Sequence, residues 1–107
     1  MKRYAMVIHL KSEKIDEYKK LHARVWPEVL TVLSRYHIKN YSIFLIDKLL
    51  FGYLEYHGHD YDADMASIAN DEATQRWWKL TVPCQEPLAT KNEGEWWASM
   101  QEVFHLD

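Results

Sequence analysis

The feature that most constrains the fold is a helical segment broken by a proline, at residues 18–28. Side chains four positions apart share one face of a helix, so Tyr18, His22 and Trp26 form one column of a phenol, an imidazole and an indole. Pro27 disfavours helical geometry at the residue before it and cannot donate a backbone hydrogen bond. We therefore predict that the helix kinks or restarts near Trp26, with Pro27 in the first turn of the continuation. Such a kink would fix the direction in which the imidazole points.

The other segments predict an α+β fold. A chain of 107 residues is typical of one domain, so we expect a single domain over residues 1–107. Alternating and periodic apolar positions predict a strand, a helix capped by Ser12 and broken at Pro27, two strands joined by Asp47-Lys48, two helical runs and a last strand, in this order: 3–10, 12–36, 38–46, 49–56, 60–69, 71–82 and 100–106. This order is the ferredoxin-like split βαβ arrangement, a four-stranded antiparallel sheet with helices on one face. A long loop is expected over 84–95.

The predicted strands carry large apolar side chains on both faces. The aromatic residues among them cannot all lie beneath the helices: Tyr4, Phe44, Phe51, Tyr53 and Phe104. An exposed aromatic sheet face requires a cover, and a second copy of the chain provides it with two-fold symmetry. The sequence therefore predicts a homodimer that packs sheet against sheet.

Charge and cysteine content exclude several classes of protein. The net charge is -3 and the basic residues are scattered, which argues against a nucleic-acid partner. Cys84 is the only cysteine, so neither an intrachain disulfide nor a thiolate zinc cluster can form, and a reducing cytoplasm fits. The longest apolar region, 43–54, is broken by Asp47 and Lys48, so we expect no membrane span.

His22 is the best candidate for acid/base chemistry, because an imidazole exchanges protons near neutral pH. The alternative is a structural histidine on a half-buried helix face. Tyr18, one turn away, and Tyr41, on the next strand, could orient a hydroxylated ligand or relay protons, or could simply pack. Neighbours on a helix point about 100° apart, so only one of Trp77 and Trp78 is expected to face a given pocket.

Weaker candidates have stronger structural explanations. The segment His57-Gly58-His59-Asp60 suggests a metal site, but exposed His and Asp are common in loops and nothing orients these. We therefore expect no metal. Arg76 could pair with a carboxylate or a sugar hydroxyl, although a solvated position is favoured. Glu55 and Glu102 are further acid/base candidates, but carboxylates at strand edges are usually solvated.

Four motifs in this order and spacing resemble the L-rhamnose mutarotase family over nearly the whole chain. They are Tyr18-x-x-x-His22-x-x-x-Trp26-Pro27-Glu28, Asn40-Tyr41, Gln75-Arg76-Trp77-Trp78 and Gln101-Glu102-Val103-Phe104-His105-Leu106. The resemblance implies a dimeric α/β barrel of ferredoxin-like subunits that interconverts the α and β anomers of a deoxy-sugar without a cofactor. It also implies His22 as the general acid/base and Tyr18, Tyr41, Trp77 and Trp78 as the residues that bind the monosaccharide.

The chain departs from the family pattern after Trp78. The family commonly has an Asn/Asp/Pro-rich loop there, whereas this chain has Thr81-Val82-Pro83-Cys84-Gln85-Glu86-Pro87-Leu88 and then Gly94-Glu95-Trp96-Trp97. This variant is similar to members assigned to L-fucose, which is, like L-rhamnose, a 6-deoxy-L-hexose. The choice between the two sugars stays open. So does the second proton-transfer group, for which Tyr18, Tyr41 and water are the options.

Two other functions fit the same order of elements, because a fold does not fix a function. One is a small monooxygenase or haem-degrading enzyme on the same dimeric barrel, with His22 or His9 as a haem ligand or oriented acid. The other is a non-catalytic sugar-binding or dimerisation module.

Overall fold

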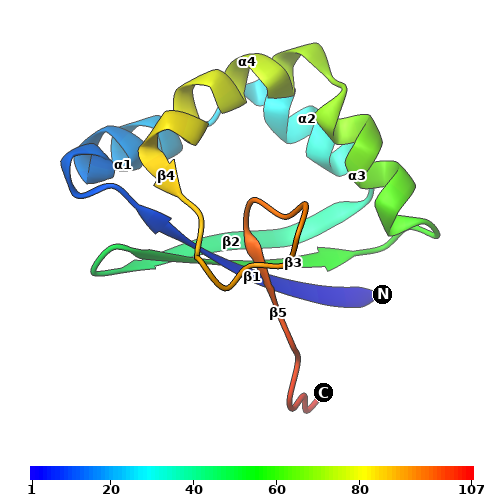
Figure 1. Ribbon diagram of the computed structural model, residues 1–107. Coiled ribbons are helices and arrows are strands. Elements are labelled where there is room, and N and C mark those ends of the chain that lie inside the picture. Colours follow the sequence, from blue (N-terminus) through cyan, green and yellow to red (C-terminus); the bar gives the residue numbers. More distant parts are fainter.

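Four α-helices cover one face of an antiparallel sheet (Figure 1) in the computed structural model, which describes residues 1–107. The elements are β1 (Lys2–Leu10), η1 (Ser12–Lys14), α1 (Ile15–Ala23), α2 (Pro27–Arg35), β2 (Ile38–Ile46), β3 (Leu49–Tyr56), α3 (Tyr61–Ala69), α4 (Glu72–Thr81), η2 (Val82–Cys84), β4 (Gln85–Glu86) and β5 (Ala98–Met100). None of the helices combines the length and hydropathy that a membrane crossing requires. The predicted α+β fold is confirmed.

The sheet has the strand order of the split βαβ fold. β3 lies between β2 and β1, and the other edge of β1 pairs with both β4 and β5. Leu10 is opposite Gln85 in β4, whereas Ala5 is opposite Met100 in β5. Two short strands separated by residues 87–97 therefore occupy the fourth position of the sheet, and the expected loop over 84–95 contains one of them, β4.

The prediction of a last strand over 100–106 is wrong. β5 covers Ala98–Met100, and the chain then leaves the sheet as a C-terminal tail, residues 101–107 (Figure 1). The apolar side chains of this tail find no surface within the same subunit, and Phe104 is 78 % exposed. Alternation indicates residues that suit a strand but does not fix where pairing ends, and the tail leaves β1 although Lys2–Tyr4 continue beyond the Ala5–Met100 pair.

The helical break at Pro27 is confirmed. α1 ends at Ala23, Trp26 is extended (φ −59°, ψ 134°), and Pro27 begins α2. Proline fits there because the first helical N–H has no intrahelical partner. The start of the first helix differs from the prediction, since Ser12 caps nothing: the Lys11 carbonyl accepts from the Lys14 N–H and opens a 3₁₀ turn instead.

The predicted hairpin of β2 and β3 is confirmed, and Asp47 turns the chain. Its φ of 53° is in the left-handed region, which aspartate tolerates better than most residues. The two later helices begin at aspartate caps. Asp60 accepts from the Ala63 N–H and Asp71 from the Thr74 N–H.

Alternate residues of the strands face the helices and form the core. Two buried clusters lie there: Ile8, Leu10, Tyr18, Leu50 and Cys84 in one, and Val32, Ile38, Leu54, Tyr56 and Ile68 in the other. Tyr4 belongs to this side too, because its ring stacks on Tyr61 of α3 with centroids 3.9 Å apart.

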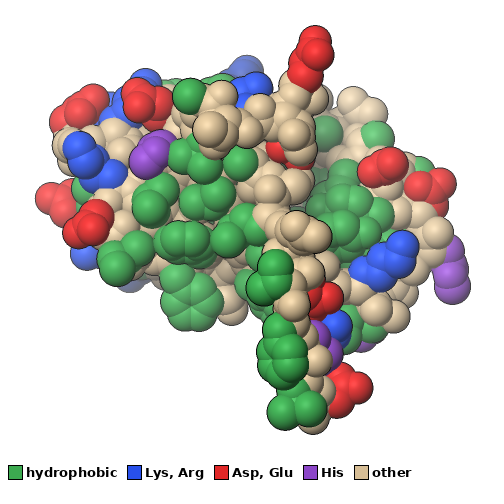
Figure 2. All heavy atoms as spheres, turned by 60° about the horizontal axis from the view of Figure 1, so that its bottom comes forward, with side chains coloured by type: hydrophobic (Ala, Val, Ile, Leu, Met, Phe, Trp, Pro, Cys, Tyr) green, Lys and Arg blue, Asp and Glu red, His purple; other side chains and the backbone are tan.

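The residues that alternate with these in the strands point away from the helices. They form the outer face of the sheet: Ala5, Val7, Phe44, Ile46, Leu49, Phe51 and Tyr53. Phe44 is 65 % exposed and Ile46 59 %. In Figure 2, where the lower side of the molecule is turned forward, hydrophobic side chains collect over this side of the molecule and along the C-terminal tail.

Candidate active site

A cavity of about 620 Å³ lies between the helices and the inner face of the sheet. Hydrophobic residues supply 17 of its 21 lining positions. The four others are His22, Thr74, Thr81 and Gln85. A mostly apolar cavity of this size with a few polar groups is typical of a small-molecule site.

His22 presents one free nitrogen in this cavity. Its Nδ1 lies 2.9 Å from the Tyr18 carbonyl oxygen. A carbonyl can only accept, so Nδ1 carries the proton and Nε2 of the neutral ring is left as a base. Partial burial lowers the pKa of His22, and the bond to the Tyr18 carbonyl opposes this shift. The ring is therefore neutral at neutral pH and able to accept a proton.

Two aromatic rings hold the imidazole. The Tyr18 ring stacks on it, with centroids 4.1 Å apart and planes 25° apart, and Trp77 meets it edge-on at 5.4 Å. Trp26 also contacts Trp77 edge-on, at 5.2 Å. Trp26 lies beyond the end of α1, so the predicted column of Tyr18, His22 and Trp26 does not follow one helix face. Trp77 connects His22 to Trp26 by contacting both rings.

Tyr18 stands behind the cavity wall and does not line it. It is buried, and burial raises the pKa of its phenol. Its hydroxyl oxygen accepts a hydrogen bond of 3.2 Å from Nε2 of Gln85. The structure therefore brings Tyr18 against His22 and Gln85, both of which line the cavity.

Tyr41 reaches the cavity through a β-bulge. The register of β2 against β3 shifts between Lys39 and Ser42, so Asn40 and Tyr41 share the space opposite Leu54. Asn40, with φ 48°, turns outward and donates to Glu55 over 2.7 Å, while Tyr41 turns inward and lines the cavity. Although 38 % of the Tyr41 surface is exposed, desolvation raises its pKa to about 12. The phenol stays protonated and can donate a hydrogen bond.

Both members of the Trp77-Trp78 pair line the cavity, so the expectation that only one would do so is wrong. Trp77 is 5 % exposed and forms the wall, whereas Trp78 is 41 % exposed and lies at the rim. Side chains of neighbouring helical residues point about 100° apart, but both can reach the same cavity when it is wide and open on one side.

Sequence reasoning missed Gln85 and Trp96. Gln85 is buried in β4, and its Oε1 accepts from Nε1 of Trp96 over 2.8 Å. Both residues line the cavity, and so does Trp97. The available signal was the second Trp-Trp pair, which directly follows a run of polar and small residues, 89–95.

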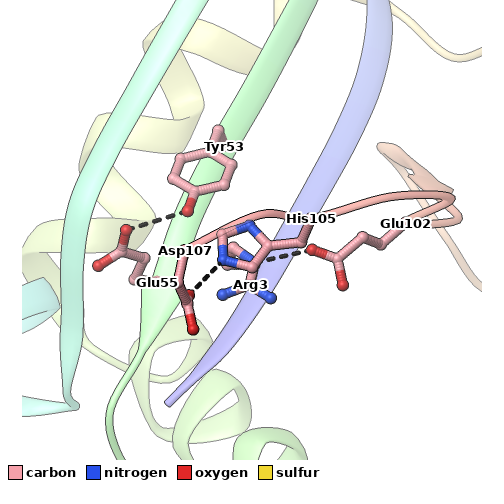
Figure 3. Close-up of polar contacts among 6 residues, drawn as sticks. All are labelled: Arg3, Tyr53, Glu55, Glu102, His105 and Asp107. Carbon is pink, nitrogen blue, oxygen red and sulfur yellow. Dashed lines mark hydrogen bonds and ion pairs between the residues drawn. The ribbon is translucent and has the colours of Figure 1, made fainter.

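The weaker candidates lie elsewhere. Glu55 accepts from the Tyr53 hydroxyl and Glu102 pairs with Arg3 at 2.7 Å, both on the outer side of the sheet near the C-terminal tail (Figure 3). They are too remote to act as partners of His22 across the sheet. In the 57–60 segment, the Asp60 side chain caps α3. Arg76 is exposed and does not line the cavity.

Comparison with known proteins identifies relatives over the full length. The family model described as L-rhamnose mutarotase matches residues 3–106. L-rhamnose mutarotases of Lactiplantibacillus plantarum and Pectobacterium atrosepticum are 40 % and 42 % identical, each with 100 % of both chains covered. The crystal structure of an L-rhamnose mutarotase from Formosa agariphila, 23 % identical, has the same fold, with a TM-score of 0.79 over 100 % of both chains. The chain belongs to the L-rhamnose mutarotase family.

Proposed function

We propose that this chain interconverts the α and β anomers of a 6-deoxy-L-hexose, L-rhamnose or L-fucose, with His22 as the general acid/base. The observation that carries the proposal is the fixed tautomer of His22, whose free Nε2 belongs to a residue lining the aromatic cavity. Membership of the family supports the same reaction. The reaction needs no cofactor, because it transfers protons and breaks and re-forms one carbon–oxygen bond without a change of oxidation state.

The steps follow from the groups present. Nε2 of His22 accepts the proton of the anomeric hydroxyl while the bond between the anomeric carbon and the ring oxygen breaks. The ring oxygen gains a proton from an acid, and the sugar becomes an open-chain aldehyde. Rotation about the adjacent carbon–carbon bond exposes the other face of the aldehyde. Reversal of both proton transfers then closes the ring as the other anomer.

The aromatic lining suits the rest of the sugar. Trp77, Trp78 and Tyr41 line the cavity. Indole faces cover C–H groups and a deoxy methyl group, whereas a phenol that keeps its proton donates to a hydroxyl. We assign the binding of the monosaccharide to these three residues. Tyr18 lies behind the wall and supports His22 through its carbonyl and its ring.

Saturation-transfer proton NMR between the two anomeric signals tests the reaction. We expect the native protein to speed the exchange of L-rhamnose or L-fucose above the rate in buffer. Measuring both sugars at one protein concentration identifies the preferred substrate. Unchanged exchange for both would overturn the proposal.

We also propose that the active form is a homodimer joined through the outer face. That face combines exposed Phe44 and Ile46 with half-buried Phe51 and Tyr53, and both signs of charge border it at Arg3 and Glu55. A patch with both features can meet its own copy about a two-fold axis. Sedimentation should give twice the subunit mass of 12.8 kDa; a species of 12.8 kDa at working concentration would contradict the dimer.

We place the protein in the cytoplasm. Its single thiol, Cys84, is buried and unpaired with another cysteine, and it donates to Glu17 over 3.2 Å. Burial raises the pKa of this thiol to about 11, so it stays protonated and unreactive. A reducing compartment suits such a chain. Fractionation of cells that express it tests this placement.

A further inference from the structure

The cavity wall contains a polar chain that the reaction above does not use. It runs from Trp96 through Gln85 to Tyr18, and it ends against His22. Gln85 is only 6 % exposed, in a wall that is otherwise mostly apolar. A buried amide is tolerated where its donor and acceptor are both paired, as they are here.

The direction of the Gln85 amide is fixed by chemistry. The indole N–H of Trp96 can only donate, so the amide oxygen must face it, at 2.8 Å. The amide nitrogen therefore faces the Tyr18 hydroxyl, at 3.2 Å, and donates to its oxygen. The amide donates to Tyr18 and accepts from Trp96, whereas a carboxylate could only accept from both and an apolar side chain could form neither hydrogen bond.

Tyr18 in turn holds His22 in two ways. Its carbonyl accepts the Nδ1 proton at 2.9 Å, and its ring stacks on the imidazole at a centroid distance of 4.1 Å. Gln85 is the one side chain that hydrogen-bonds the Tyr18 hydroxyl. A shift of the phenol would turn the surface on which the imidazole rests, and with it the direction of Nε2.

We propose that Gln85 is a positioning residue that, clamped by Trp96, fixes the Tyr18 ring and thereby aims Nε2 of His22 at the sugar. This role rests on the proposed anomer exchange. It also links residues 87–97, which carry Trp96 at the cavity rim, to the catalytic base. Errors of about 1 Å in the placement of a reacting group can cost about 100-fold in rate, so a small tilt is sufficient for a measurable effect.

Substitutions that remove single bonds test the proposal. Gln85→Met keeps the length of the side chain and removes both hydrogen bonds, and we expect kcat to fall about 10-fold to 100-fold with a smaller change in KM. Tyr18→Phe removes the hydroxyl that accepts from Gln85 and keeps the ring that stacks on His22. Gln75→Met is the matched control, because Gln75 is an exposed glutamine of α4 that bonds the Ala69 carbonyl and does not line the cavity.

The double variant separates positioning from general packing. If Gln85 acts through Tyr18, the double variant should be as active as the less active of the two single variants, within about 3-fold, because both changes break the same hydrogen bond. Multiplying effects would overturn the proposal, and so would full kcat in Gln85→Met. Native protein without any exchange activity would instead defeat the proposed function and leave this question to the next measurement.

A spectroscopic readout tests the clamp without activity. The Trp96 indole proton, assigned by its loss in Trp96→Phe, should resonate downfield and exchange slowly with solvent in the native protein. Gln85→Met should move it upfield and speed its exchange. An indole signal unchanged by Gln85→Met would show that the clamp does not exist. If Gln85→Met fails to fold, Trp96→Phe, which keeps an aromatic ring and removes the N–H, should still lower kcat; full kcat there would overturn the proposal.

Discussion

The two faces of the sheet use aromatic residues in opposite ways. On the inner side, Tyr18 of α1, Trp77 of α4 and Trp96 of residues 87–97 are each held by a hydrogen bond or a ring contact with another side chain at the cavity that His22 lines. On the outer face, Phe44 is 65 % exposed in the single subunit. Aromatic rings that are each held by a specific contact are suited to a ligand or catalytic site, whereas an exposed apolar patch is suited to association with another subunit. The comparison predicts that changes on the inner face act within a subunit and changes on the outer face act between subunits.

The largest expected effect on folding is on the inner face. Leu50→Ala removes a side chain that is 2 % exposed in the cluster around Ile8. Such truncations leave a cavity and cost about 2–5 kcal/mol in the free energy of unfolding. Urea denaturation measures the cost. A loss below about 1 kcal/mol would mean that the inner face is not the core described here.

On the outer face, Phe44→Asp should break the proposed dimer while the subunit remains folded. A buried aromatic anchor at an interface contributes about 2 kcal/mol or more, so the dissociation constant should rise by at least about 30-fold. Sedimentation measures it, and circular dichroism monitors the fold. Ser34→Asp adds the same charge on the exposed side of α2 as the control. An unchanged dimer would place the interface on another surface.

A smaller effect concerns pH. Because burial lowers the pKa of His22 below its ordinary 6.5, the base form persists to lower pH than in a free imidazole. The exchange rate should thus hold through pH 6.5 and fall only below it. Stability has the same sign: the unfolded chain takes up the proton first, so folding weakens as pH falls through 6.5 and levels off below the folded pKa. His22→Gln should remove this contribution. A rate that halves at or above pH 6.5 would contradict the assignment.

The sequence predicted what local rules decide. Pro27 stops one helix and starts another by its own geometry, and Asp47 turns the hairpin by tolerating a positive φ. The family prediction is confirmed as well. By contrast, the alternation of residues 100–106 indicated a strand, yet the chain stops pairing at Met100, although Lys2–Tyr4 of β1 continue beyond the Ala5–Met100 pair. A local pattern does not show where pairing with a neighbouring strand ends.

The missed part of the site depends on contacts distant in sequence. Gln85 gains a role at the site only through its hydrogen bonds to Tyr18, 67 residues earlier, and Trp96, 11 residues later. Tyr41 was a candidate from its chemistry and its place on the next strand, but its inward direction depends on the bulge at Asn40, which no glycine marks. These features follow from tertiary packing, so spacing along the chain could not reveal them.

The most direct test of the account is anomer exchange by saturation transfer in two histidine variants. His22→Ala removes the proposed base, and exchange should fall by about 10²–10⁴-fold. His59→Ala removes an exposed imidazole from the turn before α3 and should retain the native rate. A native rate in His22→Ala, in a protein that stays folded, would contradict the central claim that the inner face is built around this imidazole.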